Sequence, residues 1–168
     1  QSMSNPDTLK LFITWTFGSL SSVGWEQMSV MAPVIACGIL TALLLQKQLN
    51  ILLLGKNYAN GLGVSVPRLR LWIILATALL AGTSTAFTGP IAFIGITMPH
   101  VARGLFGSPN HRIILPASML CGAITLLVCD LISQLPGMQG TLPINAVTAL
   151  FGSPIIVWII LRNSYINK

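Results

Sequence analysis

The chain has 168 residues, of which 54% are hydrophobic and only 7% are charged. Soluble domains carry about 25% charged residues, so the composition excludes a soluble globule and predicts an integral membrane protein. A net charge of +6 would suggest a nucleic-acid partner for a soluble domain. Here the positive residues lie between apolar spans, so we attribute the charge to membrane topology and expect no nucleic-acid partner.

The first apolar stretch, residues 7–20, is too short to cross a bilayer, which takes about 20 residues. It follows a helix-start signal that ends at Asp7. We therefore expect an interfacial helix on the outer face, with Trp15 and Trp25 at the level of the lipid headgroups.

The rest of the chain predicts an all-α, polytopic membrane protein with about five transmembrane helices. The expected spans are residues 28–45, 71–87, 89–103, 113–135 and 143–161.

The third span is unusual, because Gly95 and Pro99 interrupt an apolar run that basic residues close. Backbone groups freed by proline must find partners inside the protein or in a water-lined cavity, so this span is expected to face inward. An ordinary kinked transmembrane helix is an equally open alternative. Gly152 and Pro154 are expected to interrupt the fifth span in the same way.

Residues 49–64, between the first two spans, are too polar to cross a membrane and too apolar for a solvated loop. The pattern fits a short helix that is broken at Gly55 and stopped at Gly61 and Gly63. Such a segment either lies flat on the bilayer or docks a partner protein. Composition alone favours the membrane-surface helix.

The basic residues fix the expected orientation. With five spans, every Lys and Arg except Lys10 falls on one side of the membrane. The positive-inside rule makes that side cytoplasmic, so the chain starts outside and its C-terminus is cytoplasmic.

Several motifs agree with one family. They are Leu54-Gly55 with Ala59 and Leu62-Gly63, Gly89-Pro90 with Gly95, Pro99-His100 with Arg103, His111-Arg112, Asp130-Leu131, and Leu142-Pro143 with Gly152 and Pro154. From Trp15 to Arg162 the chain resembles permease subunits of the FecCD type. These are the membrane parts of bacterial ATP-binding-cassette (ABC) importers for ferric siderophores, haem and cobalamin.

The resemblance implies a single transmembrane domain, residues 1–168, that corresponds to helices six to ten of a ten-helix permease in the bacterial inner membrane. It implies ABC ATPase subunits, an extracytoplasmic substrate-binding protein and a second permease subunit as partners, besides membrane lipid. ATP would act only through the ATPase, with no cofactor or metal bound directly and no catalytic residue. It also reverses the preference for residues 49–64, which become cytoplasmic coupling helices that dock the ATPase through Leu54, Gly55, Ala59, Leu62 and Gly63.

The remaining motif positions carry signature or structural roles by resemblance. His100 has no acidic or cysteine cluster beside it in the sequence, which favours a packed or hydrogen-bonding histidine over a base or metal ligand. Asp130 lies in apolar sequence, where carboxylates are functional by default, but close enough to the end of its span for a cap or hydrogen-bonding role.

Two positions depart from the family pattern. Where the family often has Arg four residues after this Asp and Glu before the last Leu-Pro, the chain has Gln134 and Thr141. Binding-protein docking at these two positions therefore differs from the usual charged contact.

Three other functions fit the sequence less well. A secondary transporter or channel with a broken-helix site is the main alternative, but it leaves residues 49–64 without a role. A copper or haem handler would use Met98, His100, Met119 and the cysteines, but Met98 and His100 are two residues apart and cannot share a helix face. No nucleophile–base pattern predicts an enzyme.

Overall fold

The computed structural model describes residues 6–20, 23–134 and 143–166. Every secondary-structure element in these ranges is a helix, which confirms the predicted fold class. The helices are α1 (Pro6–Phe17), α2 (Trp25–Leu44), α3 (Gln46–Leu52), α4 (Lys56–Gly61), α5 (Val66–Thr88), α6 (Ile94–Phe106), α7 (His111–Ser133) and α8 (Ile144–Ile166).

The helices α2, α5 and α7 are each long and apolar enough to cross a membrane. Helix α6 has 13 residues, about 20 Å at 1.5 Å per residue, so it covers only part of a hydrocarbon core of about 30 Å. In α8, the stretch Ile144–Val157 forms a shorter apolar segment.

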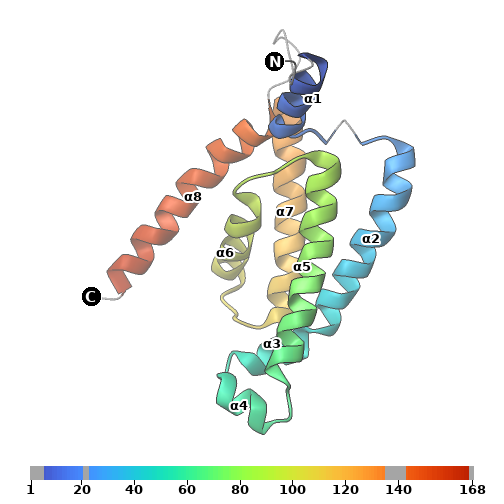
Figure 1. The fold of residues 1–168 in the computed structure, drawn as a ribbon. Coiled ribbons are helices and arrows are strands. Elements are labelled where there is room, and N and C mark those ends of the chain that lie inside the picture. The colour runs from blue at the N-terminus through green and yellow to red at the C-terminus, as the bar shows by residue number, and fades with distance from the viewer. Residues whose placement is uncertain (1–5, 21–22, 135–142, 167–168) are drawn as a thin grey trace, which may run out of the picture.

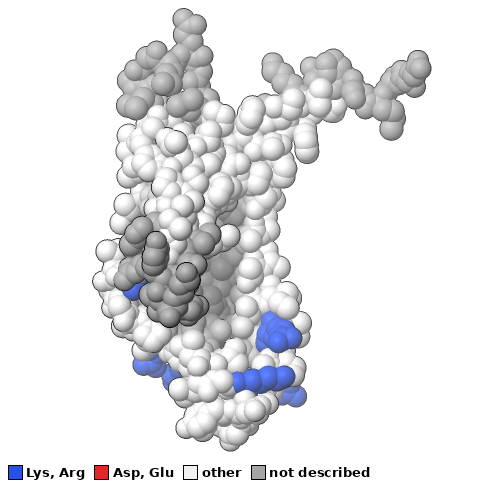
Figure 2. Space-filling view, turned by 90° about the vertical axis from the view of Figure 1, so that its left-hand side faces the viewer, with Lys and Arg blue, Asp and Glu red and all other residues white. Residues whose placement is uncertain are grey.

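In chain order, helices α2, α5, α6, α7 and α8 run alternately down and up between two ends of the molecule (Figure 1). Helix α2 packs against α5, and α7 packs against α6, α8 and α3. One end carries α3, α4 and the 107–110 connection, and α1 lies at the other. Described Lys and Arg side chains gather toward the α3–α4 end, which we call the basic end (Figure 2).

Large apolar side chains stay exposed along the spans. Only 6% of the apolar window of α2 is buried, against 22% in α7. A bilayer or further protein can cover such surfaces, since lipid is as apolar as leucine. Helix α7 is thus the most enclosed of the three long spans.

The predicted interruption of α8 is wrong, and of the two alternatives for the third span the continuous helix is the one observed. Helix α6 continues through Gly95 and Pro99, and α8 continues through Gly152 and Pro154. A proline removes one hydrogen bond, and packing against neighbouring helices keeps the remaining backbone bonds in place. The real break comes earlier, at Phe93, which has a φ of 69°.

Other boundaries also move. Helix α5 begins at Val66 rather than residue 71, with Pro67 in its first turn, where proline is favoured. The third span becomes helical only at Ile94, after a non-helical segment from Gly89 to Phe93. Residues 136–142, which lie between the fourth and fifth predicted spans, are outside the described residues.

Helices α6 and α8 meet at Gly152. A Cβ atom there would lie 2.5 Å from the Phe93 Cβ and 3.3 Å from its Cγ. Phe93 cannot yield by a simple rotamer change, because its Cβ is fixed by the backbone.

We therefore predict that Gly152→Ala destabilises the intact permease by about 1–3 kcal/mol through overpacking. Thermal unfolding in detergent measures this change. Gly104→Ala is the matched control, since a Cβ there meets nothing within 4 Å. An equal melting temperature for both variants would contradict the tight α6–α8 contact.

Candidate functional site

Helices α3 and α4 form a compact knob, residues 46–64, at the basic end (Figure 1). Gly55 separates them with a φ of 103°, a conformation that other residues rarely adopt. After α4, the Gly63 N–H donates to the Asn60 carbonyl at 3.0 Å and the Val64 N–H donates to the Ala59 carbonyl at 3.0 Å. This pair of hydrogen bonds is a Schellman motif, which ends the helix sharply. The predicted break at Gly55 and stop at Gly61–Gly63 are confirmed.

The knob carries apolar side chains that point to the outside. Leu54 is 65% exposed and Leu62 is 56% exposed, with Leu53 and Tyr58 similarly open. Gly55 and Gly63 are exposed too. Clustered apolar exposure of this kind marks an interaction surface.

Ala59 differs from the other predicted docking residues, because it is 0% exposed. Its methyl group is shielded from solvent, and its carbonyl accepts the hydrogen bond from the Val64 N–H that closes the Schellman motif. Ala59 therefore sets the shape of the knob.

A hydrogen-bonded junction ties the knob to α7. The Asn50 side chain on α3 donates through Nδ2 to Asn110 Oδ1 at 2.7 Å. Its Oδ1 accepts from the His111 backbone N–H at 2.8 Å and lies 2.9 Å from His111 Nδ1. Asn110 in turn caps α7, with its Oδ1 accepting from the Arg112 N–H at 3.0 Å.

The direction of these bonds is fixed by the backbone. The amides of His111 and Arg112 can only donate, so the atoms facing them must be the side-chain oxygens of Asn50 and Asn110. The Asn50 NH₂ group then faces the Asn110 oxygen. Since Asn50 Oδ1 is an acceptor, His111 Nδ1 carries a proton.

At the opposite end, the non-helical segment from Gly89 to Phe93 is held by neighbours. The Ala92 N–H donates to Asn145 Oδ1 on α8 at 3.1 Å. The Ser19 N–H, just after α1, donates to the Thr88 carbonyl at 2.9 Å. A Cβ on Gly89 would collide with the Trp15 carbonyl, so only glycine fits against α1 there. Pro90 is half-buried beside it.

Asp130 and Gln134 lie together near the same end. The Gln134 Nε2 donates to Asp130 Oδ2 at 2.7 Å, one helical turn apart on α7. The sequence left two roles open for Asp130, a functional role and a hydrogen-bonding role. The structure shows the hydrogen-bonding role. Thr141 lies outside the described residues, and Pro143 precedes α8, where its carbonyl accepts from the Ala146 N–H at 3.0 Å.

The Pro-His-x-x-Arg signature lies on α6 toward the basic end. Pro99 is half-buried, and His100 and Arg103 are exposed. The Arg103 carbonyl accepts from the Gly107 N–H, where α6 ends in a left-handed residue. No group of three His, Cys, Asp or Glu side chains suited to a metal is present among the described residues.

Sequence reasoning missed Asn50 and Asn145. Asn145 is an isolated amide at the apolar start of α8, whereas Asn50 lies in α3 together with Gln46, Lys47 and Gln48. Each of the two bonds to a residue more than 50 positions away in sequence. A lone polar residue in an apolar pattern is the signal that the sequence offers for Asn145, and Asn50 has no such signal among its polar neighbours.

Comparison with known proteins agrees with this architecture. Residues 1–162 match the model of the FecCD transport family. The chain is 41% identical over 158 residues to the vitamin B12 import system permease protein BtuC of Vibrio cholerae, covering 92% of this chain and 46% of that protein. It is 40% identical over 148 residues to the Fe(3+) dicitrate transport system permease protein FecC of Escherichia coli, covering 88% and 44%. It is 36% identical over 160 residues to the hemin transport system permease protein HmuU of Yersinia pestis, covering 95% and 48%.

A solved structure of a metal-chelate type ABC transporter in an inward-facing conformation superposes with a TM-score of 0.85 at 29% identity, covering 94% of this chain and 52% of that one. The chain spans about half the length of the curated relatives that it matches. Because the family model covers nearly the whole chain, and the fold is that of an ABC transporter permease, this chain belongs to the FecCD transport family.

Proposed function

We propose that this chain forms half of a permease subunit in an ABC importer, corresponding to helices six to ten. Substrates named for its relatives are vitamin B12, Fe(3+) dicitrate and hemin. The proposed substrate class is therefore a large metal chelate, such as a ferric siderophore, haem or cobalamin. A partner ATPase would hydrolyse ATP, and this chain would provide part of the path.

One observation carries the proposal: the Asn50 side chain connects the exposed knob to the first turn of α7. An ATPase that pushes on Leu54 and Leu62 would move α3, and the hydrogen bonds would pass that motion to α7. Helix α7 packs against both α6 and α8, so the three would tilt together. Such rocking alternates access to a central path.

The positive-inside rule gives the proposed orientation. The basic end would face the cytoplasm of the bacterial inner membrane, together with the C-terminus. The opposite end would then meet an extracytoplasmic binding protein near Gln134, and Thr141 is the second docking position proposed from the sequence. A second permease subunit, identical or different, and membrane lipid would cover the exposed apolar faces.

Membership of an ABC permease family does not favour the alternative of a secondary transporter or channel. An ABC importer also gives the knob a role as the docking site for the ATPase, and a secondary transporter or channel gives it none. No resident cofactor enters the proposal.

Leu54→Glu should weaken ATPase binding by at least about tenfold, because a charge would be desolvated at the centre of an apolar contact. Co-purification of the ATPase with the tagged, intact permease measures the loss. Leu105→Glu is the matched control, since Leu105 is 70% exposed near the basic end but lies on α6. Undiminished ATPase recovery with Leu54→Glu would refute docking at the knob.

Asn50→Leu should leave ATPase binding intact but uncouple it from transport. Loss of the junction should lower substrate uptake per ATP hydrolysed by about tenfold, equivalent to about 1.4 kcal/mol of coupling. The assay is uptake and hydrolysis in the same proteoliposomes. Asn57→Leu, an exposed change on α4, should keep the ratio. A normal ratio in Asn50→Leu would show that force takes another route.

Gln134→Arg tests the opposite end. An arginine there would replace the Asp130 hydrogen bond by an ion pair one turn apart and present a positive charge to the binding protein. We predict a severalfold gain in affinity for the binding protein, driven by electrostatic complementarity and reduced by added salt. Binding is measured by pull-down at two salt concentrations, and unchanged or weaker affinity would count against docking at this end of α7.

A further inference from the structure

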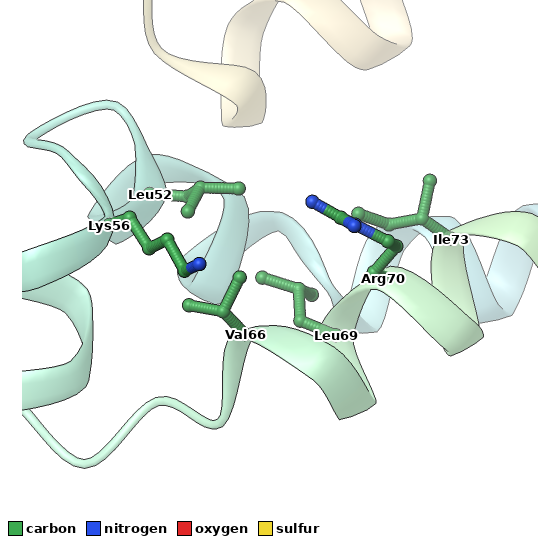
Figure 3. A pocket seen from close by; sticks show the side chains of 6 residues that line it. All are labelled: Leu52, Lys56, Val66, Leu69, Arg70 and Ile73. Carbon is green, nitrogen blue, oxygen red and sulfur yellow. The ribbon is translucent and has the colours of Figure 1, made fainter.

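A cavity of about 190 Å³ opens at the basic end, between the knob and the start of α5. It is lined by Leu52, Lys56, Val66, Leu69, Arg70 and Ile73. Four of these six side chains are apolar, and the other two are cations. Figure 3 shows the charged ends of Lys56 and Arg70 pointing toward the space above Val66 and Leu69.

No acidic residue of this chain is placed to balance the two cations. The sequence has three carboxylates, Asp7, Glu26 and Asp130. They lie on α1, in the first turn of α2 and near the end of α7, all at the opposite end of the molecule. Lys56 and Arg70 therefore face an apolar cavity as a pair of like charges without an internal counter-ion.

The cavity also lies at the depth of a bilayer surface. Helix α5 has 23 residues, about 35 Å, which slightly exceeds a hydrocarbon core of about 30 Å. Arg70 lies in its second turn, so its guanidinium reaches the headgroup region. Trp72, two residues further on, is 52% exposed, as expected of an interfacial anchor.

We propose that this cavity binds one anionic phospholipid of the leaflet at the basic end. Lys56 and Arg70 hold the phosphate, and an acyl chain lies against Leu69 and Ile73. A phosphodiester supplies the missing negative charge, and the apolar floor explains why a lipid fits better than a free anion. The lipid thereby joins α4 to α5 and stiffens the base of the knob. The site is independent of the transported substrate, so it can fail without affecting the proposed function.

Native mass spectrometry of the intact permease, titrated with phosphatidylglycerol in detergent, tests the proposal. Lys56→Gln and Arg70→Gln should each weaken retention of one lipid by about fivefold, the factor for one cation near a membrane surface. Arg68→Gln removes the same charge from the same helix but does not line the cavity, so it should change retention by less than about twofold. Thermal unfolding of each variant checks that the fold is kept.

Two comparisons separate this lipid from other occupants. Excess inorganic phosphate should not displace the phosphatidylglycerol, and phosphatidylcholine should be retained less. Displacement by phosphate would identify a free-anion site and overturn the proposal. Equal losses in Arg68→Gln and Arg70→Gln would show general attraction to the basic end, and would overturn it too. Loss of the lipid when the ATPase binds would assign the cavity to the ATPase instead.

Discussion

One amide side chain, Asn50, joins the α3–α4 knob to α7. Both of its polar atoms are used: the NH₂ group bonds to the Asn110 side chain, and the oxygen accepts from the first turn of α7. Hydrogen bonds fix direction as well as distance, unlike the apolar contacts that hold the long helices together. Under the proposed docking, a push on the knob would therefore be passed to α7. Helix α7 is the most enclosed of the three long spans, and it packs against α6 and α8.

At the opposite end, a small number of hydrogen bonds likewise hold a non-helical segment in place. The segment from Gly89 to Phe93 leaves the helical ladder, so its backbone groups need partners outside a helix. Asn145 satisfies the Ala92 amide, and the stretch after α1 satisfies the Thr88 carbonyl. Because Gly152 admits Phe93 closely, α6 and α8 meet without a gap at this break. The short α6 thus begins at this hydrogen-bonded segment and runs toward the basic end.

Much of this architecture could be predicted from the sequence, because apolar runs and glycine signals are local. The bounds of α2 and α7 lie within a few residues of the predicted spans, and Gly55 breaks the knob where expected. Proline was misleading: Pro99 and Pro154 lie in continuous helices, since neighbouring packing outweighs one lost hydrogen bond. The amide contacts of Asn50 and Asn145 could not be predicted, because each joins positions more than 50 residues apart. No local pattern in the sequence encodes such a partner.

The most direct test of the coupling claim is a distance between α4 and α7 in the working transporter. Spin labels at Asn57 and Ile113, both exposed, would report the spacing of the knob from the first turn of α7. If Asn50 transmits the motion, this distance stays constant when ATP binds to the wild-type permease with its ATPase, and changes or broadens in Asn50→Leu. A distance that changes with ATP to the same extent in both proteins would contradict the account.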